Sequence, residues 1–281
     1  MKAWVTGAAG MIGSEIASSA SKWAPDWEVR GLTRRDFSLL DFDAVTAAFK
    51  GDSPDVIVHC AAISRPVDCE RDPHLARKTN VVATRHLAHL ASDRFLIYLS
   101  TDLVYDGRKG DYIEEDPANP LHLYGETKLA GEDAVRQHQN HAVLRTALNF
   151  GASPRGNASF NEQMHSALAQ GKNFQLFTDE YRCPISTTET ARAIWELAKL
   201  QVGGLFLLGG SEKVSRWDIG KALYDRWSPL PGKIEPASIA SYDGPPRPPD
   251  LSMKLNKIQA LLSFDLPGFH EWINSNPDAV V

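Results

Sequence analysis

Two tyrosine–lysine pairs are the first candidates for chemistry in this sequence. Tyr124 stands four residues before Lys128, and Tyr105 stands four residues before Lys109. On a helix, residues with this spacing share a face, so the lysine can lower the pKa of the phenol from its usual value of about 10. A phenol tuned in this way can exchange a proton with a carbonyl oxygen. The spacing alone does not tell the two pairs apart, because both have it.

The neighbouring residues separate the two pairs. Tyr105 is followed by Asp106-Gly107, a turn signal, so Tyr105 and Lys109 are not expected to share a helix face. Tyr105 is therefore interpreted as a loop or packing residue. Tyr124 instead opens a segment with helical character that runs to about residue 137. We therefore predict that Tyr124, with its lysine, is the proton-transfer pair.

A hydroxyl group is expected close to that tyrosine. Thr101 and Asp102 follow an apolar run at residues 95–99, at the carboxyl edge where open α/β sheets bind their ligands. A threonine hydroxyl at this edge can hydrogen-bond the same carbonyl oxygen as the tyrosine. Thr101 and Asp102 are therefore both predicted to contact the substrate.

The elements that must hold these residues follow a regular alternation. Helical patterns separate five strand candidates, most of them short apolar runs, at residues 3–5, 28–32, 56–60, 95–99 and 142–145. Strands buried on both faces give such runs, and their alternation with helices implies a parallel sheet with right-handed crossovers. The sequence predicts an α/β fold with a doubly wound parallel sheet, of the Rossmann type.

The regular alternation ends near residue 150, which suggests two parts. Residues 1–150 are predicted to form a dinucleotide-binding domain, and residues 151–281 a smaller, interwoven C-terminal substrate-binding lobe. Helical patterns at 160–170 and 187–200 and a proline-rich stretch at 244–250 interrupt the alternation. The helix at 187–200 is expected to pack on the first domain as well.

A glycine-rich turn lies where the first strand should lead into the first helix. Gly7, Gly10 and Gly13 occur in "VTGAAGMIG" with GxxGxxG spacing. Glycines at this junction allow a tight turn and a close approach of the backbone to a pyrophosphate, whose charge meets the N–H groups of the helix N-terminus. A glycine triplet alone is weak, but its position at the first strand–helix junction favours a dinucleotide site.

Two arginines after the second predicted strand bear on the choice of dinucleotide. Arg34 and Arg35 stand where an NAD site usually has an acid for the ribose 2′-hydroxyl. A guanidinium group suits the 2′-phosphate of NADP instead. Asp36, one residue later, weakens this distinction, and a solvated basic turn is the alternative. We expect NADP(H) to be favoured over NAD(H).

Composition excludes several classes of function. The chain has 281 residues, is 43% hydrophobic and has a net charge of −5, which argues against a nucleic-acid surface. No apolar run approaches the ~20 residues of a membrane span, and the N-terminus runs directly into a strand-like stretch, so a cytoplasmic protein is expected. The three cysteines have no CxxC spacing, so neither a metal site nor a disulfide framework is expected.

The chain resembles the extended short-chain dehydrogenase/reductases, and among them most closely the dTDP-4-dehydrorhamnose reductase family, whose members bind sugar nucleotides. The matching stretches are "TGAAGMIG", "PDVIVHCAAISRPVDCERDP", "STDLVYDG", "PLHLYGETKLAGE" and "VLRTALNFG", with a looser match at "RPPDLSMKLNKI". The resemblance therefore covers nearly all of the chain. It implies reduction of a 4-keto nucleoside-diphosphate deoxysugar, first of all dTDP-4-dehydro-L-rhamnose to dTDP-L-rhamnose.

The resemblance also implies roles for individual residues. The catalytic triad falls on Thr101, Tyr124 and Lys128, with the tyrosine as the acid at the sugar's C4 oxygen and the lysine also binding the nicotinamide ribose. Together with the arginines discussed above, the cofactor contacts fall on the following residues: Gly7, Ala9, Gly10, Met11, Ile12, Gly13, Arg34, Arg35, Ala61, Ala62, Ile63, Tyr124 and Lys128.

The substrate side is less well defined by the sequence. The family usually has "RTSWVYG" where this chain has Arg145 to Gly151, so Leu148 replaces the tryptophan that lies against the sugar, and the sugar itself can differ. Arg182 and Arg247 are candidates for the substrate's pyrophosphate, because a diphosphate favours forked donors. Surface charge or an ion pair between the lobes explains these two arginines equally well.

Two other functions stay open at this level. The first is a sugar-nucleotide epimerase or dehydratase, although dehydratases typically follow the Thr-Asp pair with a glutamate and this chain has Leu103. The second is a non-catalytic NADP-binding subunit similar to the regulatory subunit of methionine adenosyltransferase; the intact Thr-Tyr-Lys set argues against it. The sequence does not fix the assembly state, and a homodimer is compatible with it.

Overall fold

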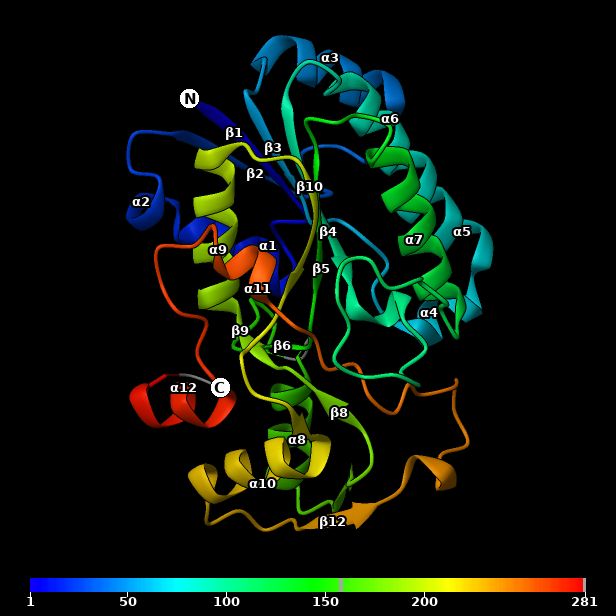
Figure 1. The fold of residues 1–281 in the computed structure, drawn as a ribbon, viewed down its shortest axis with the longest axis vertical. Helices are drawn as coiled ribbons and strands as arrows, with labels where there is room; N and C mark the ends of the chain where they lie inside the picture. Colours follow the sequence, from blue (N-terminus) through cyan, green and yellow to red (C-terminus); the bar gives the residue numbers. More distant parts are fainter. Residues whose placement is uncertain (157–158, 280–281) are drawn as a thin grey trace.

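A parallel β-sheet forms the centre of the molecule (Figure 1). The structure is a computed structural model that describes residues 1–156 and 159–279. In spatial order the six strands of this sheet are β10 (Gly204–Leu208), β5 (Ala142–Thr146), β4 (Phe95–Thr101), β3 (Val56–His59), β1 (Lys2–Thr6) and β2 (Glu28–Leu32). Every neighbouring pair is parallel. The predicted doubly wound fold is confirmed, and its five predicted strands are present.

Helices cover both faces of the sheet (Figure 1). On one face lie α1 (Met11–Ser18), α2 (Ala20–Trp23), α9 (Thr187–Leu200) and α11 (Asn256–Gln259). On the other lie α3 (Phe42–Asp52), α4 (Pro66–Arg71), α5 (Pro73–Arg77), α6 (Ala83–Leu90) and α7 (Leu123–Val135). Side chains of β1 alternate between these layers: Val5 packs in the α1 and α9 layer, and Trp4 meets the ring of Phe49 on α3 edge-on at 5.5 Å.

The continuous helical segment formed by α5 and α6 contains a π-helical turn. Lys78–Val82, labelled η1, joins α5 to α6 and adds one residue to the turn. Such single π turns in α-helices frequently mark functional sites. Here the buried side chain of Asn80 contacts Ile63 in the loop that follows β3. The helical pattern itself gives no sign of this irregularity.

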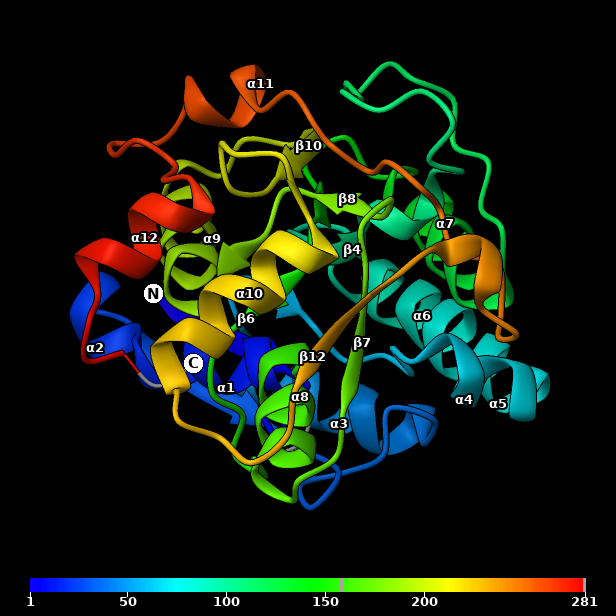
Figure 2. The same ribbon diagram turned by 90° about the horizontal axis from the view of Figure 1, so that it is seen from below.

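The C-terminal part supplies both a smaller lobe and part of the main sheet. The lobe contains short paired strands and the helices α8 (Phe160–Ala169), α10 (Arg216–Trp227) and α12 (Phe269–Ser275). Figure 2 shows β7 (Phe174–Phe177) beside β12 (Ile234–Ala237), and these two strands pair in parallel. Strand β10, which was not predicted, lies beyond residue 150 and yet joins the main sheet. The indole of Trp195 on α9 donates to the carbonyl of Ile16 at 3.0 Å.

The outer edge of the sheet at β10 has a polar partner. The backbone N–H of Leu207 donates to Oε1 of Glu114 at 3.1 Å, from the loop that follows β4. Glu114 thus occupies a position where a further strand would pair. Within the part of the chain that the structure describes, no helix has both the length and the apolar character needed to cross a bilayer.

Candidate active site

The predicted glycine turn joins β1 to α1 in a geometry that only glycine adopts easily. Gly7 has φ +72°, and a Cβ at this position would lie 2.8 Å from the backbone nitrogen of Ala61. At Gly13 a Cβ would contact the carbonyl oxygen of Gly7. Gly10 caps α1, and its N–H donates to the same carbonyl at 2.8 Å. The turn therefore leaves backbone and the helix N-terminus free of side-chain bulk, as a dinucleotide requires.

The structure brings the other predicted cofactor segments next to this turn. The segment after β3 lies against Gly7 through the backbone of Cys60 and Ala61, and Ala62 and Ile63 follow directly. The N–H of Ala8 donates to the carbonyl of Leu32 at the end of β2, at 3.1 Å. Arg34 and Arg35 follow this strand and are exposed. Ala9, Met11 and Ile12 lie within the turn and the first residues of α1. The fold thus gathers the residues predicted to bind the cofactor around one end of the sheet.

The acid beside these arginines is already engaged. The carboxylate of Asp36 accepts hydrogen bonds from the N–H and the hydroxyl of Thr33, at 2.9 and 3.0 Å. The backbone hydrogen bond from Thr33 holds the pKa of Asp36 below its usual value. Asp36 therefore closes its own turn, and Arg34 and Arg35 are exposed beside it.

Thr101 and Tyr124 meet at the carboxyl end of β4. Thr101 is the last residue of this strand, and Tyr124 is the second residue of α7; both are buried. Burial raises the pKa of the Tyr124 phenol above its usual value, and a hydrogen bond with Thr101 opposes this effect. The N-cap of α7 is His122, whose Nδ1 accepts from the N–H of Gly125 at 3.2 Å. This cap fixes the first turn of the helix and hence the tyrosine.

Lys128 does not act on the phenol in the way the spacing suggested. Its Nζ donates to the carbonyl of Leu99 at 2.7 Å and lies 3.9 Å from the centre of the Tyr98 ring. The prediction that Lys128 lowers the pKa of Tyr124 is therefore wrong in this structure, where burial raises that pKa. The i, i+4 spacing places both side chains on one face of α7 but does not decide where the ammonium group points. Burial lowers the pKa of Lys128 to about 7, and Glu132 opposes this shift.

The competing pair proves to be structural, as interpreted from the sequence. Tyr105 is fully buried and stacks on Tyr112 at 4.1 Å between ring centroids. Its hydroxyl donates to the carbonyl of Ile113 at 3.1 Å. Lys109 pairs instead with Asp116, at 2.5 Å. Tyr105 and its lysine are thus engaged in separate contacts, and the interpretation of Tyr105 as a packing residue is confirmed.

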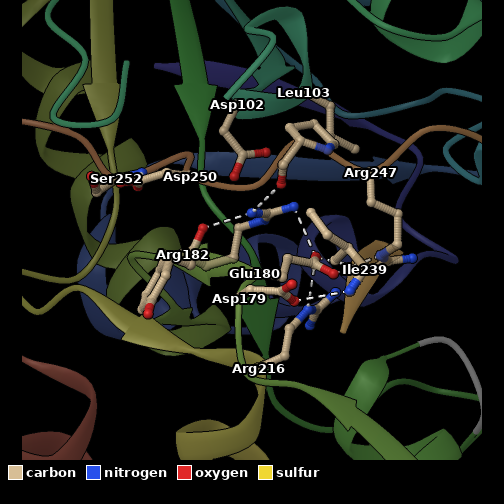
Figure 3. A network of polar contacts seen from close by, with 12 residues as sticks. Asp102, Leu103, Asp179, Glu180, Arg182, Arg216, Ile239, Arg247, Asp250 and Ser252 are labelled. Carbon is tan, nitrogen blue, oxygen red and sulfur yellow. Dashed lines mark hydrogen bonds and ion pairs between the residues drawn. The ribbon is translucent and has the colours of Figure 1, made fainter. Parts of the chain in front are cut away.

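The two arginines predicted to bind the substrate's pyrophosphate meet at one buried carboxylate (Figure 3). Glu180, directly before β8 (Tyr181–Arg182), pairs with Arg182 at 2.8 Å and with Arg247 at 2.5 Å. Arg216, the first residue of α10, joins them at 3.2 Å. Burial opposes ionisation of Glu180, but the three guanidinium groups outweigh it and lower the pKa of Glu180 to about 2. We call these four residues the arginine cluster.

The arginine cluster carries more positive than negative charge. Three arginines share the single carboxylate of Glu180, and Nη1 of Arg216 is buried without a hydrogen-bond partner among the described residues. Asp102 faces Arg182 across this cluster (Figure 3), and its Oδ2 also lacks such a partner. Burial raises the pKa of Asp102 to about 6, against the effect of Arg182. The cluster therefore has unused capacity for an anion.

Leu148, the predicted sugar contact, packs in the smaller lobe. It stands between β5 and β6 (Asn149–Phe150), and its carbonyl accepts from the N–H of Ile185 on β9 (Ile185–Ser186) at 3.0 Å. Its side chain is partly buried against the apolar core of the smaller lobe, which contains Phe150. Its predicted contact with the sugar stays a prediction.

Asn80 is a site residue that the sequence reasoning missed. Its Oδ1 accepts from the N–H of Ile63 at 2.8 Å, and its Nδ2 donates to the Ile63 carbonyl and to the Thr127 hydroxyl, both at 3.0 Å. One side chain thus ties the predicted cofactor segment to α7, directly beside Lys128. A polar residue on the buried side of a long amphipathic helix was the available signal.

The sequence also did not predict a buried ion pair one helical turn from Lys128. Glu132, one helical turn after Lys128, accepts from Nε and Nη2 of Arg145 on β5, at 3.0 and 2.7 Å. The hydroxyl of Ser100 donates to the same carboxylate at 2.5 Å, and Nη1 of Arg145 reaches the Tyr105 hydroxyl at 2.8 Å. We call Glu132 and Arg145 the buried pair. An arginine inside the apolar run at 142–145 was the signal, because a buried cation needs a buried partner.

Comparisons with known proteins agree on one family. The family model described as "RmlD substrate binding domain" matches residues 1–279. The β subunit of methionine adenosyltransferase 2 from Danio rerio is 32% identical over 272 residues, which cover 92% of this chain and 84% of that protein. A dTDP-4-dehydrorhamnose reductase from Sinorhizobium fredii is 29% identical over 286 residues, which cover 96% of this chain and 95% of the relative.

Solved structures resemble the whole chain. A hypothetical dTDP-4-dehydrorhamnose reductase from Sulfolobus tokodaii superimposes with a TM-score of 0.84 at 30% identity, covering 96% of this chain and 97% of the other. The dTDP-4-dehydrorhamnose reductase of Bacillus anthracis, solved in complex with NADP, gives a TM-score of 0.89 at 20% identity, covering 98% and 97%. The second likeness, at this identity, concerns the fold.

Proposed function

Because this chain belongs to the family of the RmlD substrate binding domain, we propose that it uses NADPH to reduce the 4-keto group of a nucleoside-diphosphate deoxysugar. The specific substrate in this proposal is dTDP-4-dehydro-L-rhamnose, and the product is dTDP-L-rhamnose. The observation that carries the proposal is the Tyr124 phenol hydrogen-bonded with Thr101 at the sheet edge that also holds the glycine turn. A cytoplasmic location is part of the proposal, and a homodimer is compatible with it.

In the proposed reaction Tyr124 is the proton donor. Its raised pKa keeps the phenol protonated at neutral pH, which is the form that can give a proton to a carbonyl oxygen as that oxygen becomes an alkoxide. The hydroxyl of Thr101 holds the same oxygen. Both groups are buried, and in a site shielded from water their hydrogen bonds to a developing negative charge are stronger than in solvent.

The cofactor in this proposal rests on the glycine turn and the arginines after β2. When bound, the nicotinamide supplies the hydride to the carbonyl carbon. The turn fits a pyrophosphate because Gly7, Gly10 and Gly13 place no side chain between the backbone and a ligand at the N-terminus of α1. Arg34 and Arg35 fit a 2′-phosphate, since both are exposed and Asp36 is held by Thr33. Asn80 fixes the segment at Ile63 relative to α7.

The proposed place for the substrate's diphosphate is the arginine cluster. A diphosphate is a dianion, and the cluster's excess positive charge and the unpaired Nη1 of Arg216 favour such a ligand. Asp102 lies between this cluster and Thr101, with which its Oδ1 shares a hydrogen bond of 3.2 Å. The sugar attached to the diphosphate would then extend toward Tyr124.

A second candidate function is a non-catalytic regulatory subunit. The observation that favours it is the 32% identity with the methionine adenosyltransferase β subunit over most of the chain. An epimerase or dehydratase is the third reading, and the residue after the Thr-Asp pair, Leu103, is not the glutamate expected of a dehydratase. Assays of turnover separate these three functions.

The deciding experiment is a panel of dTDP-, UDP- and GDP-linked 4-keto sugars with NADPH. Oxidation of NADPH, followed at the absorbance band of the reduced nicotinamide, is expected with the dTDP-linked rhamnose precursor. Tyr124→Phe should abolish turnover and leave NADPH affinity within a few-fold, whereas Tyr105→Phe should keep the turnover per folded molecule. Tight NADPH binding without oxidation of any member would refute the reductase and favour the regulatory subunit.

A further inference from the structure

The ammonium group of Lys128 is buried at a place where few groups compensate its charge. The side chain as a whole is 2% exposed, and its hydrogen bond to the Leu99 carbonyl, at 2.7 Å, uses one of three N–H donors. The carboxylate one turn further along α7, Glu132, is already shared with Arg145 and Ser100. A buried charge is costly unless other groups replace its hydration. Another group must therefore stabilise this cation.

The ring of Tyr98 lies in the position to do so. Nζ of Lys128 is 3.9 Å from the ring centroid, well within the distance at which an aromatic face attracts a cation. Tyr98 is itself fully buried, and burial raises the pKa of its phenol well above the usual value, so the ring is neutral. Lys128 on α7 and Tyr98 on β4 therefore form a buried cation–π contact.

The surroundings hold the Tyr98 ring in this orientation. Its hydroxyl reaches the backbone carbonyl of Lys128 at 3.5 Å. The same hydroxyl fills the space beside Gly131, where a Cβ would touch it. On the other side, the ring of His59 lies 5.7 Å away between centroids. These contacts hold the ring in one orientation, with a face toward the ammonium group of Lys128.

We propose that Tyr98 is a positioning residue whose ring face stabilises the charged form of Lys128 and holds its ammonium group in place next to the active site. This inference rests on the proposed function and deepens it, because the family resemblance implies that Lys128 acts together with Thr101 and Tyr124. Tyr98 lies three residues before Thr101 on the same strand, so β4 supplies both the hydroxyl at the reacting oxygen and the support for the lysine. The role requires the aromatic face and not the hydroxyl.

The test compares Tyr98→Phe, which keeps the ring, with Tyr98→Leu, which removes it. The free energy of unfolding of each variant is measured with denaturant at pH 5 and pH 9. The folded protein holds Lys128 charged at pH 5 and neutral at pH 9, because its pKa is about 7. The free energy of unfolding of the leucine variant should lie further below that of the phenylalanine variant at pH 5 than at pH 9. The additional loss at pH 5 should be about 1.4 kcal/mol, which corresponds to a shift of about one unit in the lysine pKa.

The sign of this effect follows from proton linkage. The pKa of Lys128 is lower in the folded than in the unfolded chain, so stability should rise with pH between about 7 and 10. Loss of the ring lowers the folded pKa further, and the rise should start at a lower pH. Both variants lack the tyrosine hydroxyl, so ionisation of a phenol at this position does not enter the comparison.

The control repeats both substitutions in a Lys128→Met background, where the additional loss at pH 5 should vanish. A leucine–phenylalanine difference that is the same at pH 5 and pH 9 while Lys128 is present would overturn the inference and leave Tyr98 as a space-filling residue. The measurement needs neither substrate nor cofactor. Failure of every keto sugar in the panel would therefore refute the reductase without affecting this result.

Discussion

The buried pair and the arginine cluster both place a carboxylate among guanidinium groups, but their charges are balanced differently. In the buried pair, one arginine meets one glutamate, and Ser100 and Tyr105 satisfy further polar atoms. In the arginine cluster, three arginines from separate segments meet one glutamate, and Nη1 of Arg216 has no hydrogen-bond partner within residues 1–156 and 159–279. A network with matched charges has no need of a further charged ligand. A network with an excess of cations is suited to an additional anion.

This difference also follows the position of each network in the fold. Glu132 and Arg145 lie between α7 and β5, and their side chains are 0% and 3% exposed. The arginine cluster lies where β8, α10 and the proline-rich segment at 244–250 approach the carboxyl end of β4, and the side chain of Arg247 is 27% exposed. The first network therefore joins a helix to the sheet, and the second joins the smaller lobe to the active site.

The same substitution in both networks gives the largest expected effect. Arg145→Met leaves Glu132 charged and buried with only the Ser100 hydroxyl, so the free energy of unfolding should fall by about 3–5 kcal/mol. Arg216→Met should cost much less, because Glu180 keeps Arg182 and Arg247 as partners. Denaturant unfolding at neutral pH measures both. Equal losses of unfolding free energy in the two variants would contradict the proposed difference in charge balance between the two networks.

Acid should weaken the arginine cluster in a defined pH range. The pKa of Glu180 is about 2 in the folded protein and about 4.5 for an ordinary glutamate. Because the folded pKa is lowered, its contribution is complete above about pH 4.5 and is lost as the pH falls toward 2. The free energy of unfolding is followed from pH 6 to 2.5 for the wild type and for Glu180→Gln. Only the wild type should lose the stability that the ionised Glu180 contributes. Parallel curves would contradict the assigned pKa.

Ligand binding should respond to the arginine cluster and not to the buried pair. Arg216→Met is expected to weaken the binding of a dTDP-linked sugar roughly ten- to a hundred-fold, as for the loss of a charge-assisted contact of about 1.5–3 kcal/mol. Calorimetric titration measures the affinity, and Arg136→Met, an exposed arginine at the end of α7, is the matched control. Unchanged affinity in Arg216→Met would contradict the proposal that this cluster binds the diphosphate.

Exposed arginines should give the smallest effect. Arg34 and Arg35 face solvent, where water screens a contact with a 2′-phosphate more than in the buried cluster. We expect NADPH to bind more tightly than NADH, by about ten-fold, and replacement of both arginines with alanine to remove most of the difference. Fluorescence titrations with the two nucleotides measure this ratio. Equal affinities in the unmodified protein would disprove the predicted preference for NADP.

Much of the fold could be predicted because it depends on local patterns. Most of the predicted strands are short apolar runs, whereas β2 (EVRGL) has two exposed charged residues, and the glycine turn lies at the predicted strand–helix junction. The sixth strand, β10, was missed because it follows the irregular C-terminal segment. Its position beside β5 depends on α9 packing against α1, which brings residues distant in sequence together.

The site was predictable only in part, for a related reason. Arg182 and Arg247 could be named from their residue type, but Glu180 and Arg216 could not, since no spacing rule connects the segments that meet there. Spacing placed Tyr124 and Lys128 on one face of a helix without showing that the lysine turns toward Leu99 and Tyr98. Side-chain direction depends on the acceptors that the sheet offers, and these appear only in three dimensions.

The contact between Glu114 and the edge strand β10 has a consequence for how molecules of this protein meet one another. An edge strand with free N–H and C=O groups is a template on which a second chain can add a strand, and this is a common start of aggregation. At Leu207 the carboxylate takes up one of these N–H groups and brings a negative charge to the edge. A Glu114→Ala variant would keep its fold but leave the N–H of Leu207 unpaired at the edge of the sheet. At high protein concentration the edge strands of two molecules would then pair more readily.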